Sequence, residues 1–418
     1  MPIEFRKRII VFFGSILVVG CGSSPSATTA PVCNGSAPIT GAEVTATPLV
    51  TPYQATLTGC TLIDYSVTAT IGGTPGMNVI IDSGSSTLAV ASTICTNCTS
   101  ITPVYQSGPS TQYTCEAGSS LYGDGSGWYA TLFNDAVQVG TIPLATMSLA
   151  AITSQTGGFF GSGDCSLGNS GTNSSQGIMG LAGPDIAISG TTGYLDALNS
   201  QQSFPDIFAV QLCMTGGNIW FGNFDSTYTA SAPAYTPILQ TGAYYYVNLT
   251  DMLVNTTSVG GTASSFADGI IVDTGTTLGI FPQTIYDTLT SDITANATFA
   301  AKFAPNASSW FDNGQCTSVP SMTEAQLDAA LPPLKLQLDQ VGGGTLTVSL
   351  PATRSYLDMH EMGGVKYYCP GIAPDGGSGP DIIGGSLLRS QIVIFDRNSA
   401  QIGFAPQNAQ GAPKGCVL

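Results

Sequence analysis

The chain has 418 residues, of which 10 are basic, 26 are acidic and one, His360, is histidine. This length exceeds that of a single hydrophobic core, so two lobes are expected, and a charged content of 9% excludes a disordered chain or a coiled coil. The net charge of −16 disfavours nucleic acids and acidic membrane surfaces as partners, while one histidine leaves carboxylates as the main groups for acid–base catalysis.

The N-terminus has the pattern of an export signal. Three bases at positions 6–8 precede an apolar run over 9–19, which is shorter than the roughly 20 residues that span a bilayer. Val18-Val19-Gly20-Cys21 resembles a bacterial lipobox, so residues 1–20 are expected to be removed and Cys21 lipidated, which would anchor the protein at the cell surface or outer membrane. The alternative is an ordinary signal peptide cut beyond Cys21, and a secreted protein.

Residues 21–60 are rich in Ser, Thr, Ala and Pro and are predicted to form a surface tether. From about Asp64 onward, short β-branched and aromatic runs separated by Gly, Asn and Asp predict a β protein with a few short helices. The expected strands include 65–71, 78–82, 136–139, 218–221, 244–249 and 391–395, and the expected helices are 284–293 and 323–331.

Charge is distributed unevenly along the chain. Residues 21–301 contain 16 acidic side chains and no Lys or Arg, so ion pairs are not expected to organise the first two-thirds of the protein. Repulsion among so many carboxylates is weakest at acidic pH, where they become protonated, which fits a protein that works in acid. An acidic surface that serves only solubility fits the composition equally well.

Ten cysteines follow Cys21, and an even number in an exported chain indicates disulfides. Cys95 and Cys98 form a Cys-x-x-Cys motif, a pattern that also occurs in redox sites and in zinc sites. Neither a second such motif nor a nearby histidine accompanies it, so a structural disulfide is the favoured interpretation and no metal is expected.

An internal repeat is the most informative feature of the sequence. An apolar strand ending in Asp82-Ser83-Gly84-Ser85 recurs as one ending in Asp273-Thr274-Gly275-Thr276. Each copy is followed about 100 residues later by an apolar–Gly element, at 178–181 and at 382–385. Two halves with the same order of motifs predict two similar lobes related by a pseudo-two-fold axis, which would bring Asp82 and Asp273 together.

The residue types in the repeat suit acid–base chemistry. Two adjacent carboxylates share a proton, so one acts as general base on a water while the other polarises a carbonyl group. Gly84 and Gly275 are expected to allow tight turns in which backbone N–H groups approach each carboxylate. The hydroxyl groups are expected to hold the carboxylates in place; they belong to Ser83, Ser85, Thr274 and Thr276. One such tetrapeptide also occurs in ordinary turns, whereas two matched copies favour a catalytic pair.

On these motifs the sequence resembles the pepsin-like aspartic proteases, over about Tyr65 to Pro406. The resemblance implies an all-β, bilobal fold, with a first lobe over 61–235, a second over 236–408 and a tail over 409–418. It implies that Asp82 and Asp273 are the catalytic residues. It also implies that the inner hydroxyls of Ser83 and Thr274 interlock across the lobes. The outer hydroxyls, of Ser85 and Thr276, would bind the carboxylates.

The resemblance further implies a flap that closes over the substrate. Tyr122-Gly123-Asp124-Gly125-Ser126 lies at the expected distance after Asp82, so Tyr122, with Gly123 and Asp124, would cover the bound peptide; an ordinary hairpin with a Gly-Asp-Gly turn fits the same residues. The family usually has a tryptophan bonded to this tyrosine, at the position of Ala89 here. Trp128 is the candidate for a different anchor.

Likeness to the plant-type branch of the family implies the disulfides Cys316–Cys369 and Cys165–Cys213. The other six cysteines allow 15 connectivities, and the sequence does not choose among Cys33, Cys60, Cys95, Cys98, Cys115 and Cys416. Residues 21–60 contain no Lys or Arg, so the basic pro-segment usual in the family is not evident.

The function implied is that of a monomeric endopeptidase without metal or cofactor, which hydrolyses peptides and proteins at acidic pH. Water would be activated between Asp82 and Asp273, and apolar residues such as Ile80 would favour hydrophobic side chains beside the scissile bond. The alternative is a pepsin-fold surface protein that binds or inhibits a partner and has weak or no catalytic activity. The presence of Ala89 where the family usually has tryptophan favours this alternative. A third interpretation, a structural surface lipoprotein, rests on the tether and export signal alone.

Overall fold

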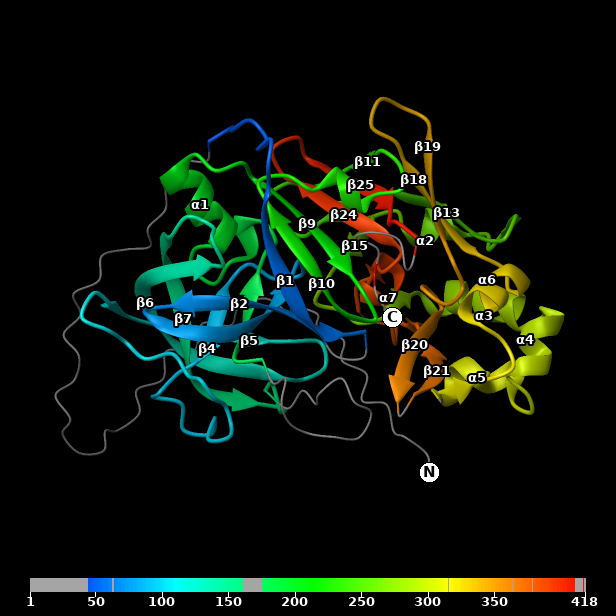
Figure 1. Ribbon diagram of the computed structural model, residues 1–418, viewed down its shortest axis with the longest axis horizontal. Helices are drawn as coiled ribbons and strands as arrows, with labels where there is room; N and C mark the ends of the chain where they lie inside the picture. The colour runs from blue at the N-terminus through cyan, green and yellow to red at the C-terminus, as the bar shows by residue number, and fades with distance from the viewer. Residues whose placement is uncertain are drawn as a thin grey trace.

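The computed structural model describes residues 44–61, 64–160, 175–314, 316–362, 364–377, 379–409 and Cys416. The expected export signal, the lipidation site Cys21 and the cysteines Cys33 and Cys165 lie outside these residues. The described chain is mostly β, as predicted, with most of its short helices at one end (Figure 1). Within it, no helix is long and apolar enough to cross a membrane.

The largest sheet has thirteen strands and runs through the molecule. In spatial order it contains β11 (Ala234–Pro237), β25 (Gln401–Pro406), β24 (Gln391–Asp396), β9 (Ile207–Leu212), β10 (Thr215–Phe221), β1 (Tyr53–Cys60), β2 (Tyr65–Ile71), β3 (Thr74–Asp82), β8 (Gly177–Gly180), β4 (Leu88–Ala91), β7 (Ala145–Thr156), β6 (Gly127–Val139) and β5 (Gln112–Leu121).

Three smaller sheets belong to the C-terminal half of the chain. The first contains β12 (Tyr246–Val247), β15 (Ile270–Val272), β23 (Ile382–Ile383), β16 (Gly279–Phe281) and β22 (Ile372–Pro374). The second contains β14 (Thr257–Ser258), β13 (Leu249–Val254), β18 (Leu334–Asp339) and β19 (Thr345–Leu350). The third contains β17 (Thr317–Ser318), β21 (Val365–Pro370) and β20 (Leu357–Met362).

The helices are short because few segments carry a helical apolar period. They are α1 (Tyr194–Gln202), α2 (Thr262–Ser265), α3 (Gln283–Thr294), α4 (Ala297–Lys302), α5 (Trp310–Asn313), α6 (Glu324–Ala330) and α7 (Gly385–Leu388), with 3-10 turns η1 (Pro184–Ile186), η2 (Ser226–Tyr228) and η3 (Ala307–Ser309). The two predicted helices correspond to α3 and α6. Helix α3 buries Ile285, Leu289 and Ile293 on one face, and α6 begins with a capping box between Thr323 and Gln326.

The tether predicted over 21–60 is wrong at its C-terminal end. Residues Tyr53–Cys60 form strand β1, which pairs with β10 and β2 inside the large sheet. Leu49 also donates a backbone hydrogen bond to the Gly222 carbonyl. The sequence did not predict this strand because its Ser, Thr and Ala residues resemble a linker. Only Leu57 and Cys60 are buried, so the strand has no clear alternation of apolar and polar residues.

The last strands of the chain are built into the sheet of the first lobe. Strand β24 pairs with β9 through Ile394 and Ala209, and β25 pairs with β24 and β11. These strands lie in the middle of the molecule, between the first-lobe strands and helices α3–α6 (Figure 1). The sheet therefore joins the two halves of the chain through backbone hydrogen bonds.

One ion-pair cluster corrects the expectation drawn from the charge distribution. Arg397, in the turn between β24 and β25, binds Asp196 of α1 and lies 3.1 Å (Nε to Oδ2) from Asp206, which precedes β9. Ion pairs thus do organise part of the first two-thirds of the chain, because the C-terminal hairpin supplies the cation that this segment lacks.

The disulfides include one predicted pair and one correction. Cys316 is bonded to Cys369, as the resemblance implied, and Cys95 is bonded to Cys98. The predicted Cys165–Cys213 pair is wrong, because Cys213 is bonded to Cys416, with the two Cα atoms 5.3 Å apart. This bond places Cys416 beside the turn between β9 and β10. Cys60 and Cys115 are also disulfide-bonded.

Candidate active site

The two halves of the internal repeat form matching strand pairs. In the first half β3 runs parallel to β8, with Ile80 opposite Ile178, and the Asp82 carbonyl accepts a hydrogen bond from Leu181 at 2.8 Å. In the second half β15 runs parallel to β23, and the Asp273 amide donates to the Ile383 carbonyl at 3.1 Å. Each aspartate therefore follows a buried strand whose position is fixed by the apolar–Gly element about 100 residues later.

The inner hydroxyl residues lock the two loops together. The Ser83 amide donates to Thr274 Oγ1 at 3.0 Å, and the Thr274 amide donates to Ser83 Oγ at 2.9 Å. Each hydroxyl in turn donates to a carbonyl of the opposite strand, Ser83 to Val272 at 3.1 Å and Thr274 to Ile81 at 2.9 Å. These four reciprocal bonds make the position of one aspartate depend on that of the other.

Each carboxylate is held by a backbone amide and an outer hydroxyl. Asp82 Oδ1 accepts from the Gly84 amide at 2.8 Å, and Oδ2 accepts from the Ser85 hydroxyl. Asp273 is bonded in the same way, by the Gly275 amide at 2.8 Å and the Thr276 hydroxyl at 2.6 Å. The side chains have few alternative orientations, since both aspartates are at most 1% exposed.

The predicted approach of the Gly84 and Gly275 amides to the carboxylates is confirmed, but the turn geometry is not what requires glycine. A Cβ atom on Gly84 would lie 2.7 Å from Asp273 Oδ2, and one on Gly275 would collide with Asp82 Oδ1. Neither glycine has a positive φ angle, so the turns themselves do not require glycine. Glycine is needed because each loop lies against the carboxylate of the opposite loop.

Burial and mutual repulsion disfavour ionisation of both aspartates. Burial, followed by the charge of Asp273, raises the pKa of Asp82 well above its usual range, against the hydrogen bonds from Ser85 and Gly84. Burial also raises the pKa of Asp273. A pair in this setting retains one proton where isolated carboxylates would have lost it, so it offers a general acid and a general base at one place.

The predicted flap is the hairpin between β5 and β6. The Tyr122 amide donates to the Ser126 carbonyl at 2.8 Å, Asp124 accepts from the Ser126 amide at 2.8 Å, and Gly125 adopts the positive φ angle that closes the turn; Gly123 lies in the same turn. Tyr122 is 2% exposed, and its ring stacks on Phe159 at a centroid distance of 5.3 Å. Nothing in the sequence around Phe159 marked it as a partner of the flap.

Trp128 takes the place of the tryptophan that is missing at Ala89. Its Nε1–H donates to the Tyr122 hydroxyl at 3.0 Å, and its side chain is 1% exposed. Ala89 and Trp128 belong to the same buried apolar cluster, so the small residue and the large one fill a shared space.

Replacing Trp128 by phenylalanine is expected to lower kcat/KM for a peptide about 3- to 10-fold, since it removes one hydrogen bond to Tyr122 while keeping an aromatic ring. Steady-state kinetics on a fluorogenic peptide would measure this. The matched control is Trp220→Phe, because the buried Trp220 Nε1 has no hydrogen-bond partner in the described chain. Equal kcat/KM values for the two variants would show that the Trp128 bond does not position the flap.

The described residues give less support to a metal site or a redox site. No group of three His, Cys, Asp or Glu side chains among them is arranged to hold a metal ion. The Cys-x-x-Cys motif is closed as a disulfide. Among the residues that the repeat and the flap pattern selected, the paired carboxylates are the groups that could carry out acid–base chemistry.

Comparison with known proteins agrees with this geometry. A family model described as eukaryotic aspartyl protease matches residues 64–407. The chain is 27% identical to a beta-secretase of Strongylocentrotus purpuratus, over 84% of this chain and 67% of that protein. It is 25% identical to an aspartic protease of Phaffia rhodozyma (80% and 74%) and 29% identical to pepsin A of Bos taurus (82% and 85%).

Proposed function

Because this chain belongs to the eukaryotic aspartyl protease family, we propose that it is an aspartic endopeptidase that hydrolyses peptide bonds at acidic pH. The observation that carries the proposal is the buried pair Asp82 and Asp273, each held by a backbone amide and a hydroxyl. Both carboxylates keep all of these hydrogen bonds, which disfavours the alternative of an inactive binding protein on the same fold.

The reaction needs only the aspartate pair and one water. The ionised carboxylate accepts a proton from the water as its oxygen attacks the peptide carbonyl carbon, and the protonated carboxyl donates to the carbonyl oxygen. The protonated carboxyl of the pair then gives its proton to the amide nitrogen while the other carboxylate takes one from a hydroxyl of the tetrahedral diol. The C–N bond breaks, the new acid and amine leave, and the pair again holds one proton. The roles belong to the pair, because the two groups titrate together.

The substrate would be an extended peptide between the flap and the aspartates. Ile80, Tyr122 and Phe159 share one apolar cluster beside Asp82, which favours hydrophobic side chains next to the scissile bond. Proteins and peptides are therefore the proposed partners, and the enzyme is proposed to act as a monomer without cofactor.

The proposed location is outside the cytoplasm. The disulfides Cys95–Cys98, Cys213–Cys416 and Cys316–Cys369 support an oxidising compartment. Together with the lipobox pattern ending at Cys21, they favour a lipid-anchored protein at the cell surface or outer membrane, with secretion as the alternative. The flap sequence and the tyrosine run over 244–246 favour an origin near the plant-type branch.

A pH profile tests the proposal. Hydrolysis requires one protonated carboxyl, so kcat/KM is expected to be highest in acid and to fall as pH rises through the raised pKa of the pair. A fluorogenic peptide assayed from pH 2 to pH 8, with cleavage sites read by mass spectrometry, would measure this. A peptide analogue with a tetrahedral hydroxyl in place of the scissile carbonyl should block the reaction. Activity that increases from pH 5 to pH 8 would sink the mechanism, and absence of both cleavage and analogue binding would favour the binding-protein alternative.

A further inference from the structure

The only histidine of the sequence, His360, lies in a contact between the two halves of the molecule. His360 is on β20, is 5% exposed, and its Nδ1 lies 3.2 Å from the hydroxyl of Thr61, which follows β1. Tyr65, the first residue of β2, completes the first-lobe side of this contact and donates a hydrogen bond to the Cys213 carbonyl. The end of β1 and the start of β2 thus meet β20 at a polar, buried place.

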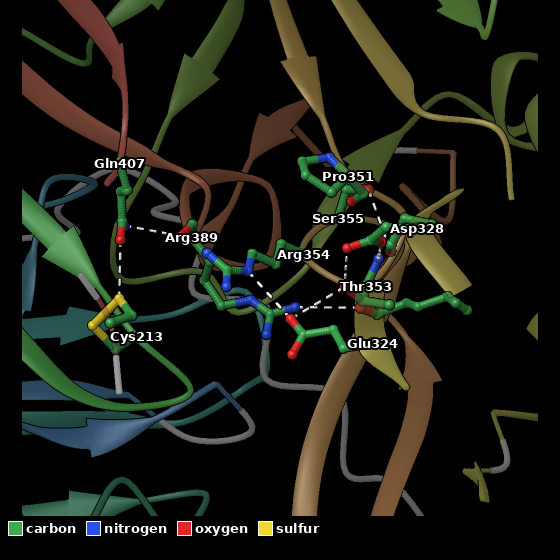
Figure 2. Close-up of polar contacts among 12 residues, drawn as sticks. Cys213, Glu324, Asp328, Pro351, Thr353, Arg354, Ser355, Arg389 and Gln407 are labelled. Atoms are coloured by element: carbon green, nitrogen blue, oxygen red, sulfur yellow. Dashed lines mark hydrogen bonds and ion pairs between the residues drawn. A yellow bond between two sulfur atoms is a disulfide. The ribbon is translucent and has the colours of Figure 1, made fainter. Parts of the chain in front are cut away.

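An ion pair occupies the second-lobe side of the same contact. Asp358, also on β20, lies 2.8 Å (Oδ1 to Nη2) from Arg389, which follows α7, and both side chains are at most 3% exposed. Arg389 and Cys213 line one small cavity, and Figure 2 shows Arg389 between the Cys213–Cys416 disulfide and the second-lobe residues Glu324 and Arg354. The His360 Nε2 atom lies 3.7 Å from Asp358 Oδ2, beyond hydrogen-bond distance.

A proton on His360 would therefore enter an environment whose charges are already balanced. Burial lowers the pKa of His360 to about 4; the charge of Asp358 opposes this change and that of Arg389 adds to it. Tyr65 faces the same ion pair, and burial raises its pKa, so it stays neutral. Protonated His360 would share the single carboxylate of Asp358 with Arg389.

We propose that His360, Thr61 and the Asp358–Arg389 ion pair form an acid-sensitive joint between the lobes. Neutral His360 keeps the end of β1 against β20. Protonated His360 places a second buried cation beside Asp358, whose carboxylate already binds Arg389, so the joint opens. The lobes then remain connected through β9 and β24 and through the interlock of Ser83 with Thr274, and they gain freedom to move in acid.

The sign of the pH dependence follows from linkage. The pKa of His360 is lower in the closed joint than its ordinary value near 6.5, so the joint is fully stable above about pH 6.5 and weakens as pH falls toward 4. For a change from about 6.5 to about 4, the equilibrium constant for opening increases about 100-fold between pH 7 and pH 4.

The titration of His360 can be measured directly, because an untagged chain has one histidine and gives one imidazole Cε1–H resonance. We expect its midpoint in the folded wild-type protein to lie near pH 4. A midpoint between pH 6 and pH 7 would overturn the proposal. This measurement needs no variant and no peptidase activity, so it stands apart from the test of the proposed function.

Hydrogen exchange would show which segments the titration releases. Amide protection in β1 and β20, corrected for intrinsic exchange, is expected to fall about 100-fold from pH 7 to pH 4 in the wild type. His360→Gln is neutral at every pH, so protection there should change less than about 5-fold. The control Thr61→Val removes the hydroxyl group, lowers protection at both pH values and leaves the pH-dependent step in place. The same pH dependence in wild type and His360→Gln would refute the joint.

Discussion

Replacing either Asp82 or Asp273 by asparagine is expected to lower kcat/KM for peptide hydrolysis about 1,000-fold at the optimal pH. Asparagine has the shape of aspartate but neither takes a proton from the water nor donates one to the carbonyl oxygen, and general acid–base catalysis contributes about 10²- to 10⁴-fold. Steady-state kinetics of the two variants at the wild-type optimum would measure the loss.

The same variants carry an internal control for folding. Since burial and repulsion raise the pKa of the pair, ionising both groups costs stability, and that cost grows as pH rises through the raised pKa. Asp82→Asn should therefore melt at a higher temperature than the wild type at pH 7 and at a similar temperature at pH 3. Asp287→Asn, on the exposed side of α3, should change neither activity nor melting temperature. Retained activity in Asp82→Asn, or a lower melting temperature at pH 7, would contradict the assignment of the pair.

Replacing Arg397 by methionine is expected to destabilise the folded protein by about 3–5 kcal/mol at pH 7, the usual cost of leaving a buried charge without its partner. Arg397 has a 9% exposed side chain and is the cation for Asp206, 1% exposed, and Asp196, 18% exposed. Burial lowers the pKa of Arg397, but the attraction of Asp196, Tyr245 and Asp206 outweighs this effect and raises the pKa, so the guanidinium stays charged. Equilibrium unfolding in guanidinium chloride would measure the loss.

A matched surface variant separates this effect from a general loss of charge. Lys302→Met removes a cation whose only described hydrogen bond is an exposed one to Ser321, and it should cost at most about 0.5 kcal/mol. Equal stability of Arg397→Met and wild type at pH 7 would show that the cluster does not hold the halves together.

The aspartate pair and the groups that hold it could be predicted from the sequence because they follow a repeated local pattern. The motif beginning at Asp82 recurs at Asp273 with the same flanking strand, and strand β2 showed its apolar period in full. Contacts between residues far apart in the chain could not be predicted from the sequence. The Cys213–Cys416 disulfide joins residues 203 positions apart, and the Arg397–Asp196 contact spans 201.

Two other features escaped prediction for different physical reasons. Strand β1 is formed largely by pairing with β10, and its Ser, Thr and Ala residues resemble those of a linker. The reason for Gly84 and Gly275 lies in the opposite loop, so no local consideration of turn geometry could identify it. The position of Trp128 next to Tyr122 was the one flap contact for which the sequence offered a candidate, through the absence of tryptophan at Ala89.

The pairing of β24 with β9 has a consequence for how the enzyme is made. Synthesis runs from the N-terminus, so β9 (Ile207–Leu212) leaves the ribosome long before its neighbour β24 (Gln391–Asp396) exists. Until then the first half has an open strand edge, and Asp206 lacks Arg397. A chain that stops before β24 therefore lacks the strand that covers the β9 edge, and the large sheet is completed only at the end of synthesis. This uncovered edge is where the unfinished chain is expected to be most prone to aggregation.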